Sequence, residues 1–120
     1  MENDCVVVWT TIASTFDGAA LAATLVDERL AACVNLLPEM ESIYRWKGRV
    51  ETDRERQVII KTTRARVSAL KARLHELHDY EVPELIVLPV ADGGDAYLQW
   101  IRESTTGSVS AEPRSGESRE

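Results

Sequence analysis

Apolar and polar positions follow two different periods along the chain, and together they predict the same strand-helix-strand order twice. Residues 4–13 contain a run of β-branched side chains and predict a first strand. A stripe of alanine, valine and leucine at helical spacing then predicts a helix that ends near Leu30. Residues 31–46 predict a long second strand, in which Pro38 indicates an edge or a bulge.

The second half of the chain continues this order. Residues 47–48 form a Lys-Gly pair typical of a tight turn, after which a third strand runs to Thr62. Residues 64–77 carry leucines on one helical face and predict a second helix. Residues 85–91 are so apolar that they predict a strand buried on both faces, and residues 96–103 predict a third helix.

The order strand-helix-strand-strand-helix-strand is that of the ferredoxin-like βαββαβ sandwich, so the fold class is α+β with an added C-terminal helix. Right-handed crossovers place both main helices on one face of a four-stranded antiparallel sheet. The other face then lacks a cover, although three strands are apolar on both sides, and we expect further copies of the chain to supply it.

The long second and third strands predict an extended hairpin, which we call the arm. Tyr44 and Trp46 lie near its tip and are expected to contact a neighbouring copy, because aromatic residues are enriched in interfaces. The charged residues 51–56 within the arm are predicted to form a solvated face.

Composition and charge indicate where the domain ends, and they limit the expected partners and location of the protein. From residue 104 onward small polar, proline and charged residues dominate, which predicts one domain over residues 1–103 and a disordered tail over residues 104–120. A formal net charge of −6 argues against nucleic acid or an anionic membrane as the main partner. No apolar run has membrane-spanning length and the first residues are acidic and polar, so a cytoplasmic location is expected.

A polar segment at residues 78–84 (HDYEVPE), called the knot here, precedes the apolar run and holds the candidate chemistry. His78, Glu81 and Glu84 offer imidazole and carboxylate ligands that could bind copper or zinc if the chain turns back on itself. The structural alternative is that His78 ends a helix while the two carboxylates accept hydrogen bonds. Lys61 interrupts an apolar strand and either faces outward or pairs with a carboxylate across a subunit boundary.

The sequence gives little support for an enzymatic activity. The sequence has no glycine-rich phosphate loop, and no nucleophile-base pair can be named. Cys5 and Cys33 lie on separate predicted strands and are expected to be reduced and buried. A binding or scaffold module is therefore favoured over an enzyme, and a hydrolase is the least favoured alternative.

Five segments, taken in order, resemble the CutA divalent-cation tolerance family across about residues 4–103. They are residues 28–35 (ERLAACVN), 42–48 (SIYRWKG), 59–62 (IIKT), 78–84 (HDYEVPE) together with 88–90 (LPV), and 97–101 (YLQWI). The resemblance implies a ferredoxin-like subunit in a tight homotrimer, similar in shape to the PII signalling proteins, with interlocking arms. It also implies tolerance of copper and other divalent cations, without an established reaction.

The chain departs from that family at three positions. Asp79 stands where proline is usual, Thr10 stands where copper-binding members can carry a cysteine, and Leu77 precedes His78 where a second histidine can occur. Of that ligand set only His78 is kept.

The sequence thus predicts a homotrimer that acts in the response to divalent metal ions, with Cu²⁺ or another divalent cation as a non-obligatory ligand. The predicted metal ligands are His78, Glu81 and Glu84, and the predicted cleft between subunits contains Lys61, Asp79 and Tyr80. The alternative is a PII-like regulatory or scaffold trimer that binds a small anion or a protein partner in that cleft.

Overall fold

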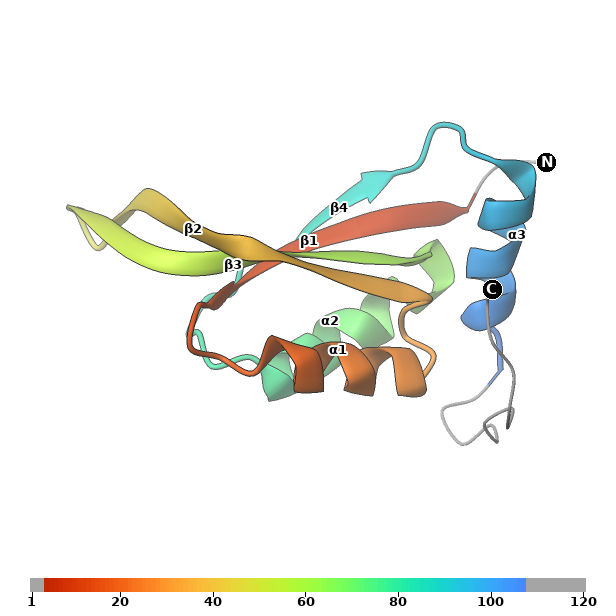
Figure 1. Ribbon diagram of the computed structural model, residues 1–120, viewed down its shortest axis with the longest axis horizontal. Helices are drawn as coiled ribbons and strands as arrows, with labels where there is room; N and C mark the ends of the chain where they lie inside the picture. Colours follow the sequence, from red (N-terminus) through yellow and green to blue (C-terminus); the bar gives the residue numbers. More distant parts are fainter. Residues whose placement is uncertain (1–3, 108–120) are drawn as a thin grey trace.

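The computed structural model describes residues 4–107 as a four-stranded antiparallel sheet with two helices against one face and a third helix at one end (Figure 1). In chain order the elements are β1 (Cys5–Ala13), α1 (Gly18–Asp27), β2 (Cys33–Trp46), β3 (Arg49–Thr63), a 3₁₀ turn (Arg64–Arg66), α2 (Val67–Leu77), β4 (Ile86–Pro89) and α3 (Asp95–Ser104). The sheet order is β2-β3-β1-β4. This is the predicted ferredoxin-like α+β fold.

The main core lies between the sheet and the pair α1 and α2. Every second residue of β1 and β3 faces the helices, as the two-residue period of a strand requires. Val8 on β1 lies opposite Ile60 on β3, and both are fully buried. The helices contribute Leu25 from α1 and Leu70 from α2, which are also fully buried in the same cluster.

Helix α1 is shorter than its apolar stripe predicts. The carboxylate of Asp17 caps its first turn by accepting a hydrogen bond from the Ala20 backbone N–H at 3.0 Å. The helix ends at Asp27, and Arg29 then adopts a left-handed backbone with φ of 60°. That turn redirects the chain so that Leu30 is buried as part of a loop and not of the helix.

The prediction that the apolar run after the knot is buried on both faces is wrong for the single chain. Strand β4 forms an edge of the sheet and pairs only with β1. Val87 packs against the core, but Ile86 and Leu88 point to the other face and are 51% and 45% exposed. The side chains on both faces of the strand are apolar, but only one of these faces packs against the helices.

The sheet face opposite α1 and α2 is therefore partly uncovered in a single chain, and we call it the open face (Figure 1). Ile86 and Leu88 of β4 lie beside the partly buried Trp9 and Val7 of β1, and Ile59 of β3 lies opposite Trp9. An apolar surface of this kind marks an interaction site more often than a free surface.

The arm projects beyond the helices, as Figure 1 shows for the paired ends of β2 and β3. Its register shifts between Leu36 and Glu39, which confirms the irregularity predicted at Pro38. At the tip, Lys47 and Gly48 both have positive φ, 50° and 79°, which suits the twist of a two-residue hairpin turn.

Helix α3 closes one end of the sheet through a small second cluster. Leu98 and Ile101 pack there against the buried Cys5 and Ala32. Among residues 4–107, none of the helices has both the length and the apolar character that crossing a membrane requires.

Residues 104–107 belong to the end of α3 and its cap, although the sequence assigns them to the tail. Thr105 is 2% exposed, and its hydroxyl donates to the Ile101 carbonyl at 2.9 Å. The Arg66 guanidinium donates to the carbonyls of Thr105 and Gly107. The rest of the predicted tail, residues 108–120, lies outside the described residues.

A chain that ends at Ser104 should therefore be less stable than one that ends at Gly107. The shorter chain loses the buried Thr105 and the acceptors of Arg66, and we expect a cost of about 1–2 kcal/mol. Urea unfolding of the two truncated proteins at equal concentration measures the difference. Equal midpoints would show that this cap contributes nothing.

Candidate functional site

His78 ends α2 and turns its ring inward, with a side chain that is fully buried. Its Nε2 atom lies 2.6 Å from the Thr11 carbonyl oxygen, and its Nδ1 atom accepts the Tyr80 backbone N–H at 3.1 Å. The neutral tautomer with the proton on Nε2 satisfies both contacts. The ring also stacks against Phe16, with 6.2 Å between ring centroids.

Both nitrogens of His78 are thus engaged within the chain, so a metal could bind the ring only by displacing one of these hydrogen bonds. Glu84 is held elsewhere, since its Oε2 accepts a hydrogen bond from Gln57 Nε2 at 3.0 Å. Within residues 4–107 no three histidine, cysteine, aspartate or glutamate side chains gather closely enough to hold a metal. The predicted set of His78, Glu81 and Glu84 is therefore not assembled by one chain.

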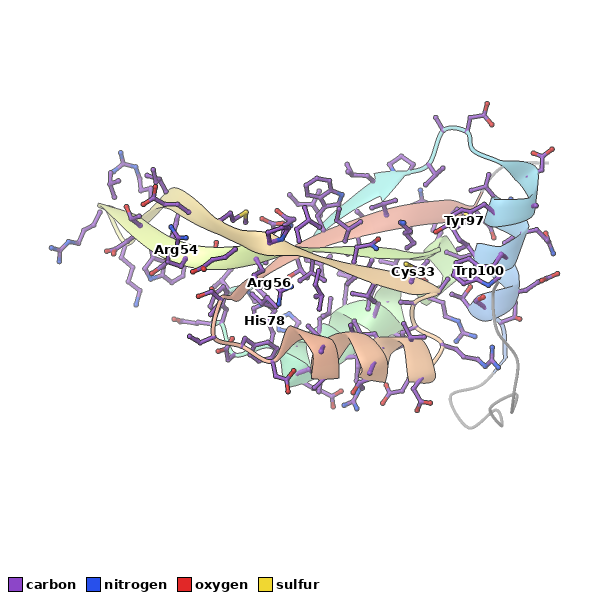
Figure 2. All side chains as sticks on the ribbon, viewed as in Figure 1. Cys33, Arg54, Arg56, His78, Tyr97 and Trp100 are labelled. Atoms are coloured by element: carbon purple, nitrogen blue, oxygen red, sulfur yellow. The ribbon has the colours of Figure 1, made fainter. Side chains whose placement is uncertain are left out.

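Lys61 does not meet the knot within the chain. Its Nζ atom lies 3.4 Å from the Tyr97 hydroxyl and 5.7 Å from the centre of that ring. Tyr97 is on α3, at the end of the molecule away from His78 (Figure 2). Within one chain Lys61 lies apart from Asp79 and Tyr80, because the β3 residues that hydrogen-bond to the knot are Glu55 and Gln57, and Lys61 lies further along the strand. Whether Lys61 meets the knot of a neighbouring subunit stays a prediction.

The knot instead meets the arm, and the two line a cleft of about 660 Å³, called the arm cleft below. The arm contributes Met40, Ser42, Tyr44, Trp46, Asp53, Glu55 and Gln57; the knot contributes Asp79, Tyr80, Glu81, Val82, Pro83 and Glu84; and β1 contributes Thr11. Tyr44 and Trp46, predicted as interface residues, thus share one cleft with four predicted site residues of the knot, Asp79, Tyr80, Glu81 and Glu84.

Hydrogen bonds from neutral donors orient the carboxylates of the arm cleft. The Tyr80 hydroxyl donates to Glu55 Oε2 at 2.7 Å, and the Tyr44 hydroxyl donates to Asp53. The bond to Asp53 is the main reason why the pKa of Tyr44 is raised to about 12, and nearby Glu55 adds to the effect. Every charged residue that lines the cleft is an acid.

Among the cleft residues, the burial of Glu55 differs most from what the sequence predicts. Residues 51–56 look like a solvated face, yet Glu55 is only 8% exposed because Tyr80 of the knot covers it. Strand alternation could have placed Glu55 on one face with Asp53 and Gln57. Nothing in the local pattern shows that a loop 25 residues away packs on that face.

Tyr80 makes the cleft sensitive to alkaline pH. Burial raises the pKa of Tyr80, and the hydrogen bond to Glu55 and the charge of that carboxylate raise it further. A proton held more tightly when folded stabilises the protein below about pH 10, the ordinary tyrosine pKa, and this contribution is lost as pH rises through the higher folded pKa.

We therefore expect the stability of the wild type to fall more steeply above about pH 10 than that of Tyr80→Phe, which has no phenol to ionise. Urea unfolding at about pH 9 and about pH 11 measures both slopes. Parallel pH profiles would show that Tyr80 holds its proton no more tightly in the folded state.

Comparison with known proteins agrees with this fold and these segments. A family model described as "CutA1 divalent ion tolerance protein" matches residues 6–104. The chain belongs to this CutA1 family. The "Divalent-cation tolerance protein CutA" of Thermus thermophilus is 48% identical over 99 residues, which are 82% of this chain and 96% of that protein.

Other CutA proteins show the same similarity over different shares of their length. "Protein CutA, chloroplastic" of Arabidopsis thaliana is 43% identical over 100 residues, and this CutA1 chain spans only 55% of its length. The crystal structure of CutA1 from Oryza sativa superposes with a TM-score of 0.83 at 42% identity, over 88% of this chain and 96% of that one. The Thermus thermophilus structure gives 0.82 at 46% identity, over 85% and 99%.

Proposed function

We propose that this CutA1 protein acts in the response to divalent metal ions as a trimeric binding module, not as an enzyme. The arm cleft carries the proposal, because its five acids, Asp53, Glu55, Asp79, Glu81 and Glu84, face one space without a basic residue in its lining. Carboxylate oxygens are ligands for divalent cations. The tolerance named for the Thermus thermophilus relative fits such a site. The cytoplasmic location of this CutA1 chain stays a prediction from sequence.

Within the cleft we assign the metal to the knot acids Glu81 and Glu84, with His78 as a positioning residue. His78 fixes the start of the knot through Thr11 and Tyr80, and so sets where the following carboxylates lie. Two carboxylates alone bind a divalent ion weakly, so water or a side chain from another copy is expected to complete the shell. The acidic lining does not favour the alternative of a small anion in this cleft.

The test is calorimetric titration with Cu²⁺ and Zn²⁺. We expect Glu81→Gln/Glu84→Gln to weaken binding about tenfold or more, since the double variant removes both proposed charged ligands. The matched control is Asp27→Asn/Glu41→Gln, which removes the same charge from exposed positions outside the cleft. Equal loss in both double variants would reduce the effect to overall charge and refute the assignment.

The proposed trimer is supported by the open face, where apolar side chains of β1, β3 and β4 lie together. Burying them against other copies would supply the cover that the sheet lacks.

A further inference from the structure

The tip of the arm and the arm cleft carry opposite charges. Residues 45–49 at the tip include three basic side chains, Arg45, Lys47 and Arg49, and no acid. All three are exposed, and within residues 4–107 none of them forms an ion pair. The charged residues that line the cleft are all acids. Each chain therefore carries one positive and one negative surface.

These two surfaces do not meet within one chain. None of the three tip bases lines the cleft, and the tip points away from the body of the chain (Figure 1). The pairing of β2 with β3 continues to Trp46 and Arg49, beside the turn, so the arm does not fold back on itself. The positive tip can therefore reach an acidic cleft only in another copy.

A ring of three copies needs two different surfaces on each chain. A two-fold interface brings the same patch of both subunits together, whereas a three-fold ring joins one patch of each chain to a different patch of the next. The basic tip and the acidic cleft are such a pair, and complementary charges fix the orientation of the partners. Since every chain carries one of each, all three tips and all three clefts are used when the ring closes.

Lys61 is the other cation that could enter a neighbouring cleft, but its surroundings favour it less. It is half-buried, and its Nζ atom lies 3.4 Å from the Tyr97 hydroxyl and 5.7 Å from the centre of that ring. Lys47 is exposed, and its Nζ atom lies 5.7 Å from the centre of the ring of its neighbour Trp46. That contact belongs to the tip itself, so it stays intact when the tip enters a cleft.

We propose that the basic tip of one copy lies in the arm cleft of the next copy, where Lys47 and Arg49 pair with Asp53 and Asp79. Both acids line the cleft. This inference rests on the proposed trimer and names the two surfaces that join its subunits.

Glu55 also gains from this contact. It is 8% exposed, and its carboxylate accepts a hydrogen bond from the Tyr80 hydroxyl at 2.7 Å. A positive charge nearby stabilises a carboxylate that is largely removed from water. Glu81 and Glu84 take no part in the pairing and are left for the metal.

The pairing is expected to set the arrangement of the trimer more than its strength. Apolar burial at the open face supplies most of the association energy, whereas ion pairs at the edge of an interface contribute little each. Loss of the pairing should therefore weaken the trimer without abolishing it.

The first experiment is cross-linking with a water-soluble carbodiimide, which joins a lysine amine to a carboxylate in contact with it. Unlabelled and ¹⁵N-labelled full-length proteins are mixed in urea and refolded together, so that a link between copies appears in mass spectra as a pair of peptides with mixed isotopes. The only lysines are Lys47, Lys61 and Lys71, which makes each link assignable. We expect mixed-isotope links from Lys47 to the peptides that contain Asp53 or Asp79.

The other two lysines decide between the alternatives. Lys71 is exposed on α2 and should form no mixed-isotope link to the cleft acids. Mixed-isotope links to these acids from Lys61 in place of Lys47 would overturn the proposal in favour of the other cation. Links from Lys47 that never mix isotopes would overturn it as well.

The second experiment exchanges the charges of the proposed pair. Lys47→Glu/Arg49→Glu should raise the dissociation constant of the trimer about tenfold or more, because the tip then repels the cleft. Adding Asp53→Lys/Asp79→Lys to the same chain restores opposite charges and should recover most of the affinity. Light scattering over a dilution series measures the association, and circular dichroism checks that each variant is folded.

Arg64→Glu/Lys71→Glu is the matched control, since it makes the same change in charge at exposed positions outside the cleft. It should leave the dissociation constant nearly unchanged. Equal weakening by the control and by the tip variant would reduce the effect to overall charge. A fourfold variant no tighter than the tip variant would refute the pairing.

This inference and the proposed function fail in different ways. A wild-type trimer without mixed-isotope links from Lys47 refutes the tip contact and leaves the trimer and its metal site. A monomeric wild type removes the trimer and the tip contact together. A metal titration without heat removes the metal site and leaves the tip contact in place.

Discussion

His78→Ala should lower the free energy of unfolding by about 2–4 kcal/mol, even with no metal present. The side chain is fully buried, so its removal leaves a cavity beside Phe16. It also leaves two backbone groups without their hydrogen-bond partner. In the wild type, the Thr11 carbonyl and the Tyr80 N–H contact the ring at 2.6 and 3.1 Å. Urea unfolding at fixed protein concentration in the presence of a chelator measures the loss.

His75→Ala is the matched control, because His75 lies one turn earlier on α2 and is exposed. We expect it to change stability by less than about 0.5 kcal/mol. His78→Gln can still donate toward the Thr11 carbonyl and should recover part of the loss. A His78→Ala protein as stable as the wild type, but deficient in metal binding, would restore His78 as a direct ligand.

Leu88→Glu should convert the proposed trimer of about 40 kDa into a folded chain of 13.4 kDa. Leu88 is 45% exposed in the single chain, so the carboxylate can remain hydrated there and the fold should survive. In a trimer that covers the open face, the same change buries three unpaired carboxylates at a cost of several kcal/mol each. Light scattering coupled to size-exclusion chromatography measures the mass.

Val26→Glu is the control for Leu88→Glu. Val26 lies on α1, is 41% exposed, and receives the same carboxylate at nearly the same exposure, but it is not on the open face. The mass of this variant should stay that of the wild type. A wild type of about 13 kDa, or a Leu88→Glu protein with unchanged mass, would remove the open face as an interface.

The elements of this fold could be read from local periodicity because each has a strong local cause. Alternation along β1 puts Val6 and Val8 on the buried face, and the Lys47-Gly48 pair suits the tight turn of the arm. The irregularity at Pro38 has an equally local cause, since proline cannot donate to the sheet. Such features depend on neighbours within a few residues.

The pattern was less informative where two faces carry the same kind of side chain. Strand β4 is apolar on both faces, and periodicity alone could not show that Ile86 and Leu88 stay partly exposed while Val87 is covered. Likewise, α1 ends at Asp27, and the positive φ of Arg29 then turns the chain away from the helix axis. The apolar stripe does not reveal this turn.

For the site, the sequence alone determined which segment matters: the knot, its acids and its family resemblance are properties of residue order. Only the tertiary structure decided what each residue does there. It turned His78 inward to hold two backbone groups, placed Lys61 beside Tyr97, and buried Glu55 under Tyr80. The physical reason is that burial, charge pairing and hydrogen bonding depend on which distant segments contact each other. Local periodicity does not determine those contacts.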